Sequence, residues 1–237
     1  MASPKQKLLF ILTSHDQLGS TGHATGWYLP EMAHPYLFLS QHYDITVASP
    51  AGGAAPLDPG SKEAFATDAD CIAFLNNPVA VHAVGHTRKL SDLSADEIAS
   101  FAGVVYPGGH GPMFDLYSSA DSHRICAAIW EQGGVVASVC HGPASVVGVK
   151  LSTGKLLIDG KHATGFSNDE EDALNLTAAM PFLLEDEIKK NGGVYSKAPT
   201  QWGEHVVVDG KFITGQNPAS SHKLGHEIHR VLSGSHQ

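Results

Sequence analysis

The amino-acid sequence predicts an α/β fold in which helices sandwich a mostly parallel central sheet. Short, continuously apolar segments that suit strands buried on both faces alternate with segments that suit helices. The 237 residues are 42% hydrophobic but only 16% charged, against about 25% charged in an average domain. Since neither repeats nor a linker interrupts the pattern, we expect a single α/β domain over residues 1–237.

Four apolar segments are predicted as buried strands, and each is followed by a glycine-rich turn and a helix candidate. They are Lys7 to Thr13, Asp44 to Ala48, Val104 to Tyr106 and Val135 to Val139. Near the C-terminus, His205 to Val208 and Lys211 to Thr214 flank the dipeptide Asp209-Gly210. Because Asp-Gly readily adopts the positive φ of a tight turn, these two segments are predicted to form a hairpin.

Six segments have the spacing and boundaries of helices. They are Trp27 to Gln41, Ser94 to Phe101, Ser119 to Gln132, Pro143 to Val149, Pro181 to Lys190 and Ser220 to Leu232. Ser94 and Glu97 have the spacing of a capping box. The segment Ala51 to Gly60 is rich in Gly, Ala and Pro, and we expect a long loop there.

Composition excludes several classes of protein. The net charge is −9, and no basic run is long enough to follow a phosphate backbone, so nucleic acid is not an expected partner. No apolar stretch reaches the length of a membrane span, and the N-terminal apolar run is short and suits a strand. Three cysteines, Cys71, Cys126 and Cys140, lack metal-site spacing and indicate free thiols in a reducing compartment, by default the cytoplasm. The low charge content suits a homodimer.

The stretch Val135 to Pro143, V-V-A-S-V-C-H-G-P, has the build of a nucleophile elbow. A strand runs directly into Cys140, which stands where a helix is predicted to begin, so the helix dipole should favour its thiolate. His141 follows and is placed to carry the thiol proton. The alternative is a small apolar cysteine buried at a strand end. The neighbouring glycine, proline and histidine favour a reactive site.

Two further segments offer partners for such a cysteine. Pro107 to Gly111, P-G-G-H-G, presents bare amides after a strand, and the amide of Gly109 is a candidate donor to an oxyanion. His110 beside it is a further candidate for the substrate site, although the motif alone also fits an ordinary flexible loop. The acidic segment Thr164 to Asp172 offers a carboxylate to orient a histidine. Glu31 lies at an otherwise apolar helix start, where a protonated carboxyl could donate to sulfur.

Five ordered motifs across nearly the whole chain resemble the ThiJ/PfpI superfamily, in particular its heat-shock, glyoxalase III type branch. They are T-G-W-Y-L-P-E-M-A-H-P from Thr25, G-G-H-G-P-M-F-D from Gly108, V-C-H-G-P from Val139, T-G-F from Thr164 and G-Q-N-P-A-S from Gly215. The resemblance implies a flavodoxin-like fold similar to class I glutamine amidotransferases. No cofactor is implied.

The resemblance also implies roles for individual residues. Cys140 would be the nucleophile, His141 its partner and Glu171 the third member of the triad. Glu31 would lie beside the sulfur, and the amides of Gly109 and His141 would form an oxyanion hole.

Two points of this assignment depend on counting and spacing. The family supplies one glutamate after T-G-F, whereas this chain has Glu170 and Glu171 together, and counting from Thr164 favours Glu171. Metal-binding members of the superfamily use other positions, so no metal site is expected. His82 and His86 are four residues apart, and we interpret that spacing as incidental.

The resemblance implies glutathione-independent conversion of methylglyoxal to D-lactate, a lyase activity that acts on a small dicarbonyl substrate through a thiolate hemithioacetal and an enediol. Three alternatives stay open: a cysteine peptidase or amidase, a stress-related holdase chaperone or protein deglycase, and a redox sensor that responds through sulfinate. Bulky Trp27, Phe166 and Trp202 near the motif ends favour a narrow pocket and a small substrate.

Overall fold

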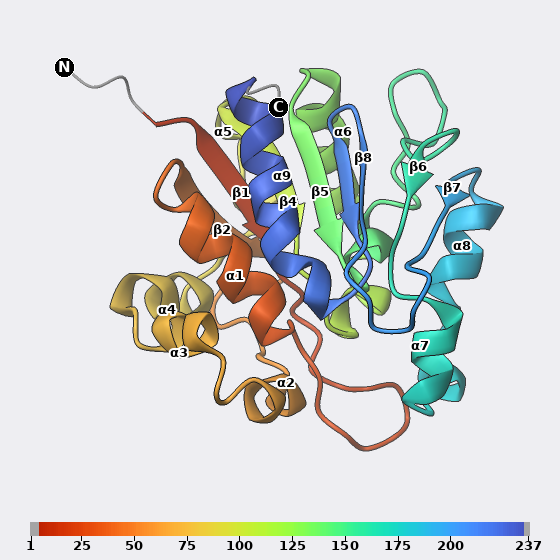
Figure 1. Cartoon of the computed structure of the whole chain (residues 1–237). Coiled ribbons are helices and arrows are strands. Elements are labelled where there is room, and N and C mark those ends of the chain that lie inside the picture. Colours follow the sequence, from red (N-terminus) through yellow and green to blue (C-terminus); the bar gives the residue numbers. More distant parts are fainter. Residues whose placement is uncertain (1–4, 235–237) are drawn as a thin grey trace.

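A seven-stranded sheet forms the centre of the molecule in the computed structural model, which describes residues 5–234 (Figure 1). Its order is β3-β2-β1-β4-β5-β9-β8, and all neighbours are parallel except β8 and β9. The strands are β1 Lys7–Ile11, β2 Asp44–Ser49, β3 Arg88–Lys89, β4 Phe101–Tyr106, β5 Val135–Val139, β8 Val206–Asp209 and β9 Phe212–Gly215. Two short strands, β6 His162–Ala163 and β7 Val194–Tyr195, pair separately. The predicted mostly parallel α/β sheet is confirmed.

Helices cover both faces of this sheet (Figure 1). They are α1 Leu29–Leu39, α2 Pro59–Ala64, α3 Ala69–Leu75, α4 Pro78–Gly85, α5 Ala95–Ala99, α6 Ala120–Glu131, α7 Asn168–Ala173, α8 Leu184–Lys190 and α9 Ser221–Ser233. Helices α1 and α9 lie together on one face, whereas α5 and α6 lie on the other. In residues 5–234, every helix is too short or too polar to cross a bilayer.

The strand order reverses at β1, which places a crevice at the carboxyl end of the strands. From β1 the chain moves outward to β2 and β3, and it then returns to place β4 on the other side of β1. Ligands of parallel α/β folds bind beyond the carboxyl ends of the strands where the order reverses. The loops after β1, β4 and β5 all start from this carboxyl end of the sheet.

The segment after β5 differs from its prediction. Instead of a helix over Pro143 to Val149, a single 3₁₀ turn covers Gly142–Ser145. Three valines and Gly148 follow within a few residues, and both residue types lower helix propensity. Phe101 was also misplaced, because it starts β4 rather than ending a helix. The hairpin and the capping box of Ser94 and Glu97 are confirmed.

Three short helices between β2 and β3 escaped the sequence analysis. The loop predicted over Ala51 to Gly60 ends at Pro59, where α2 begins. Each helix starts after a side-chain cap: Asp58 accepts from the amide of Ser61, and Asp68 and Asn77 cap α3 and α4 in the same way. The caps are visible in the sequence, but the helices are too short for a periodic apolar pattern.

Candidate active site

Cys140 occupies a strained turn at the carboxyl end of β5. Its φ is +61°, a region that side chains other than glycine seldom adopt. The strain is held by neighbours: the amide of Cys140 donates to the carbonyl of Gly215 over 3.0 Å, and its carbonyl accepts from the amide of Phe166 over 2.8 Å. Strain of this type is found where a fold must aim a side chain. The predicted elbow geometry is therefore present, although a 3₁₀ turn follows it.

The side chain of Cys140 leads into a network of two imidazoles and one carboxylate. Its Sγ lies 3.4 Å from Nδ1 of His141. Nε2 of His141 lies 2.6 Å from Oε2 of Glu171, and Nε2 of His110 lies 2.9 Å from Oε1 of the same carboxylate. His141 and Glu171 are buried, and His110 is nearly so. The structure thus brings together four residues selected from the sequence, Cys140, His141, Glu171 and His110, and the contact of His110 with Glu171 is the part that was not predicted.

The charges of this network favour a neutral base next to the sulfur. Burial lowers the pKa of His141, and the neighbouring His110 lowers it further. Burial alone would raise the pKa of Glu171, but His141 and His110 together hold it below its usual range. A neutral His141 therefore donates its Nε2–H to the Glu171 carboxylate and leaves the Nδ1 lone pair towards the thiol.

Glu170, the neighbouring glutamate, faces another way. Its Oε2 accepts from the amide and hydroxyl of Ser167 in a capping box at the start of α7. Its Oε1 accepts from Nδ2 of Asn217 over 2.8 Å and from the amide of Trp202 over 3.3 Å. Glu170 thus ties three loops together, whereas Glu171, one residue further along α7, reaches the imidazoles.

Glu31 is fully buried near the start of α1 and adjoins the sulfur of Cys140. Its Oε2 accepts from the amide of Gly108 over 2.8 Å, while its Oε1 has no hydrogen bond of good geometry within residues 5–234. Burial raises the pKa of this carboxyl to about 8. A protonated Oε1 can therefore donate towards the sulfur, as expected from the sequence.

The protonation state of Cys140 differs from the thiolate that was expected from the sequence. Burial and the Glu31 carboxyl raise the pKa of the Cys140 thiol well above its ordinary value. The predicted thiolate-stabilising helix is absent, since only one 3₁₀ turn follows the cysteine. The resting site therefore holds a thiol, and its proton must leave as the sulfur attacks.

Backbone amides close the site on the other side. A Cβ on Gly108 would lie 2.7 Å from both Oε2 of Glu31 and the amide nitrogen of His141, so only glycine lets these parts meet. Gly109 has a φ of +87°, and its amide faces the sulfur of Cys140. Within the described residues, the amides of Gly109 and His141 donate to no backbone carbonyl. The His141 amide can bind an oxyanion, and the Gly109 amide, which also interacts with the Glu31 carboxyl and the Cys140 sulfur, lies beside the place where one would form.

These groups line a cavity of about 70 Å³. Its walls are Tyr28, Gly109, His110, Cys140, His141, Phe166, Leu174, Trp202 and Pro218. Drug-sized ligands occupy roughly 300–1,000 Å³, so the space directly at the sulfur suits a molecule of a few heavy atoms. A cavity of about 430 Å³ adjoins it through the shared walls Tyr28, His110 and Leu174. Phe166 and Trp202 line it as expected, but Trp27 does not, because its ring is buried and its Nε1–H donates to the carbonyl of Ala55.

Three wall residues were missed by the sequence analysis. Tyr28 and Pro218 lie inside motifs that were recognised, but neither was expected to line the cavity, and Leu174 follows α7 without any motif.

The ligand atoms of His110, His141 and Glu171 lie within 4.8 Å of one another, so these three could also hold a metal ion. A metal ion bound there would occupy the Glu171 oxygen that orients His141 by a hydrogen bond.

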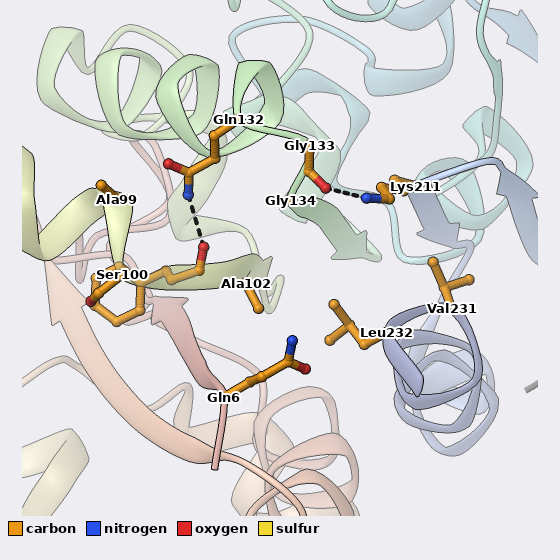
Figure 2. Close-up of a pocket in the computed structure, with 11 residues that line it drawn as sticks. Gln6, Ala99, Ser100, Ala102, Gln132, Gly133, Gly134, Lys211, Val231 and Leu232 are labelled. Carbon is orange, nitrogen blue, oxygen red and sulfur yellow. Dashed lines mark hydrogen bonds between the residues drawn. The ribbon is translucent and has the colours of Figure 1, made fainter. Parts of the chain in front are cut away.

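A larger cavity of about 430 Å³ lies at the opposite, amino end of the strands (Figure 2). It is lined by Gln6, Ala99, Ser100, Phe101, Ala102, Gln132, Gly133, Gly134, Lys211, Val231 and Leu232. The lining contains neither a cysteine nor a histidine nor a carboxylate. Its size alone does not make it a reaction site.

Known proteins share both the sequence and the fold. Glyoxalase 3 of Candida albicans is 33% identical over 230 residues, which cover 94% of this chain and 96% of that protein. The glutathione-independent glyoxalase HSP31 of Saccharomyces cerevisiae is 30% identical over 227 residues, or 93% of this chain and 94% of that protein.

A solved structure and a family model agree with these relatives. The crystal structure of glyoxalase III from Candida albicans superimposes with a TM-score of 0.87 at 31% identity and covers 95% of this chain and 97% of that one. The model of the DJ-1/PfpI family matches residues 43–230, which include the cysteine elbow and the glutamate of α7. This chain therefore belongs to the DJ-1/PfpI family.

Proposed function

We propose that this protein is a glutathione-independent glyoxalase, a lyase that converts methylglyoxal to D-lactate. One observation carries the proposal: the Cys140 thiol faces the Nδ1 of His141 at 3.4 Å inside a cavity of about 70 Å³. A three-carbon dicarbonyl fits such a space, and relatives that match nearly the whole chain are named glyoxalases. In this proposal Cys140, His141 and Glu171 are catalytic, and Glu31, Gly109 and His110 support the substrate and the sulfur.

The first step is the addition of sulfur to the aldehyde carbon, C1. The S–H proton passes to Nδ1 of His141 as the S–C1 bond forms, and Glu171 stabilises the resulting imidazolium. The amides of Gly109 and His141 hold the developing alkoxide, which then takes the proton of the Glu31 carboxyl. Each oxyanion donor typically contributes about 3–4 kcal/mol to such a step. The product is a neutral hemithioacetal.

The second step moves hydrogen between the two carbons. The Glu31 carboxylate removes the C1 proton while the His141 imidazolium protonates the C2 oxygen, which gives an enediol. Glu31 then returns a proton to C2, and His141 takes the proton of the C1 hydroxyl to leave a lactoyl thioester. C1 is oxidised and C2 is reduced, so no external oxidant is required. Water releases lactate, the imidazolium protonates the leaving sulfur, and Glu31 takes the remaining water proton.

Peptide hydrolysis is a weaker candidate for the same groups. A peptide must lay several residues across the nucleophile, and Phe166 and Trp202 bound the cavity beside it. We therefore expect no Cys140-dependent cleavage of casein.

A holdase chaperone or a protein deglycase is the second candidate function. The chaperone is supported by exposed apolar side chains on α3 and α4, where Ile72, Val79 and Val81 are 43%, 69% and 43% exposed. Holdase activity needs such a surface and no thiol, so the Cys140→Ala variant should still suppress aggregation.

We also propose that the protein is a homodimer in the cytoplasm. Light scattering after gel filtration tests the dimer.

The activity test uses the native protein and methylglyoxal in buffer without glutathione. We expect methylglyoxal to disappear with formation of an equal amount of lactate, at a rate that added glutathione leaves unchanged. Absence of lactate, or lactate only when glutathione is present, would contradict the proposal.

A further inference from the structure

A second cluster of ligating side chains lies where α1 meets the start of α3, and it shares no residue with the proposed active site. Nε2 of His34 lies 3.0 Å from Oδ1 of Asp68 and 3.8 Å from Sγ of Cys71. All three atoms lie within 4.8 Å of one another. Cys71 is fully buried, His34 is 6% exposed, and the side chain of Asp68 is 29% exposed.

The spacing of these atoms is close to one triangular face of a zinc tetrahedron. Zinc bonds of about 2.0–2.3 Å at tetrahedral angles place nitrogen and oxygen ligands about 3.3 Å apart, and nitrogen and sulfur about 3.6 Å apart. The two observed separations, 3.0 Å and 3.8 Å, differ from these by only a few tenths of an ångström. We propose that His34, Asp68 and Cys71 form a binding site for Zn²⁺, distinct from the proposed active site.

The donor set selects this class of ion. One thiolate, one imidazole and one carboxylate suit Zn²⁺, whereas Mg²⁺ and Ca²⁺ prefer sites made of oxygen alone. The thiolate and the carboxylate together balance the charge of the ion, so the buried site is neutral when filled. Binding forms a Zn–S bond and releases the thiol proton to solvent. His34 binds through the Nε2 lone pair and carries its proton on Nδ1.

Local structure holds these ligands in place before an ion arrives. Asp68 caps α3, and its Oδ1 accepts from the amide of Cys71 over 2.8 Å, so helix geometry fixes the two residues relative to each other. Nδ1 of His34 is buried with no hydrogen-bond partner within residues 5–234. In the metal-free site the Nε2–H of His34 donates to the Asp68 carboxylate, so metal binding must move this proton to Nδ1, which no other hydrogen bond engages.

Helix α9 covers one side of the cluster. The ring of His222 stacks on that of His34 with centroids 3.8 Å apart and an interplanar angle of 13°. Its Nε2 lies 3.7 Å from Oδ2 of Asp70, and its side chain is 52% exposed. Asp68 is the ligand open to solvent, so water can complete the tetrahedron from that side. A filled site would tie α1, which carries Glu31, to α3.

The test uses Co²⁺ as a spectroscopic stand-in for Zn²⁺ in the Cys140→Ala protein. In that background, a thiolate-to-cobalt charge-transfer band can arise only from Cys71 or Cys126. We expect the band to appear on addition of Co²⁺ and to disappear when Zn²⁺ displaces it. A further Cys71→Ser substitution should abolish it. A further Cys126→Ser substitution, the matched control on α6, should leave it unchanged.

A second variant protects the test against misfolding. His34→Gln in the Cys140→Ala background keeps the thiol and should weaken Co²⁺ binding at least about tenfold in equilibrium dialysis. Absence of the band in the Cys140→Ala protein, or its persistence after Cys71→Ser, would overturn the proposal. If circular dichroism shows that Cys71→Ser does not fold, unchanged affinity in the His34→Gln variant would overturn it instead.

Discussion

Both ends of the central sheet carry cavities, and a small cavity at the carboxyl end carries the chemistry. At the amino end, about 430 Å³ are lined by groups that are already paired: Nε2 of Gln132 donates to the carbonyl of Phe101 over 2.9 Å, and Nζ of Lys211 donates to that of Gly133 (Figure 2). At the carboxyl end, about 70 Å³ hold a thiol and two imidazoles, and an adjoining cavity of about 430 Å³ shares the wall residues Tyr28, His110 and Leu174. Convergence of reactive groups, and not volume, distinguishes the candidate site.

Strained backbone at non-glycine residues is also found at the carboxyl end of the sheet, beside the small cavity. Within residues 5–234, the non-glycine residues with positive φ are Cys140, Asn175 and Trp202. Two of them line the small cavity, and Asn175 follows a third wall residue. At the large cavity, positive φ occurs at Gly133, where it costs little. Strain is thus tolerated where side chains must be aimed at a substrate.

The largest effect should separate the two adjacent glutamates. Glu171→Gln removes the charge that supports the His141 imidazolium, and we expect kcat/KM for methylglyoxal to fall about 10³–10⁴-fold. Glu170→Gln disturbs the cap of α7 and the bond to Asn217, so it should lower Tm while activity stays within about threefold below the melting range. Steady-state kinetics and thermal melts check both. Equal losses of activity would remove the distinction.

A smaller effect is expected at Glu31, and it depends on pH. Glu31→Gln removes the proton donor and acceptor next to the sulfur, and kcat/KM should fall about 10²-fold. In the native protein, kcat/KM should decline above about pH 8, where Glu31 loses its proton. The variant should lack that alkaline decline. A decline that persists unchanged in Glu31→Gln would assign it to another group.

The same carboxyl should affect stability with a defined sign. Its pKa is about 8 in the folded protein and 4.5 as the ordinary value, so between these the folded state binds more protons than the unfolded state. The free energy of unfolding contributed by Glu31 therefore falls as pH rises through this window. Glu31→Gln should raise Tm at pH 8 and change it little at pH 4. Thermal melts at the two pH values check this, and an equal shift at both would contradict it.

A moderate effect is expected at the mouth of the small cavity. Trp202 has a φ of +64° and lines the cavity while 42% exposed. Trp202→Gly relieves the strained φ and opens the wall, so kcat/KM for phenylglyoxal relative to methylglyoxal should rise about tenfold. Trp202→Phe is the control, because a ring remains in place. An unchanged preference in Trp202→Gly would show that other residues set the size of the substrate.

The smallest effect should come from the large cavity. Lys211→Ala removes a charged group from the amino end, far along the strands from Cys140, and kcat/KM should change by less than about twofold. A large loss in this variant with Tm unchanged would break the comparison between the two ends.

Much of this architecture was predictable because local signals agree with the global fold. Buried strands gave apolar runs, and Asp209-Gly210 marked the hairpin, although Asp209 pairs with Phe212 and the turn itself is Gly210-Lys211. The helix expected after the elbow was wrong because its three valines and Gly148 lower helix propensity. Helices α2 to α4 were missed because each is six to eight residues long, too short to show a period.

The site was predictable as a set of motifs but not as a set of protonation states. Motif order identified Cys140 and the loop of Gly109, but the charge of the thiol depends on burial and on Glu31, which lies 109 positions earlier. The double contact of Glu171 to His110 and His141 also depends on folding, since the loop after β4, the loop after β5 and helix α7 supply one residue each. The cluster of His34, Asp68 and Cys71 has no sequence spacing that marks it.

The central claim is that Cys140 performs the chemistry inside the small cavity, and chiral analysis of the lactate tests it most directly. Native protein and Cys140→Ala are each incubated with methylglyoxal without glutathione, with Cys126→Ser as the matched control. Because one carboxyl returns the proton to one face of the enediol, native protein and Cys126→Ser should yield a single enantiomer, which the proposed function assigns as D-lactate. Cys140→Ala should yield only the slow racemic background. Racemic product from the native protein, or D-lactate from Cys140→Ala at the native rate, would contradict the account.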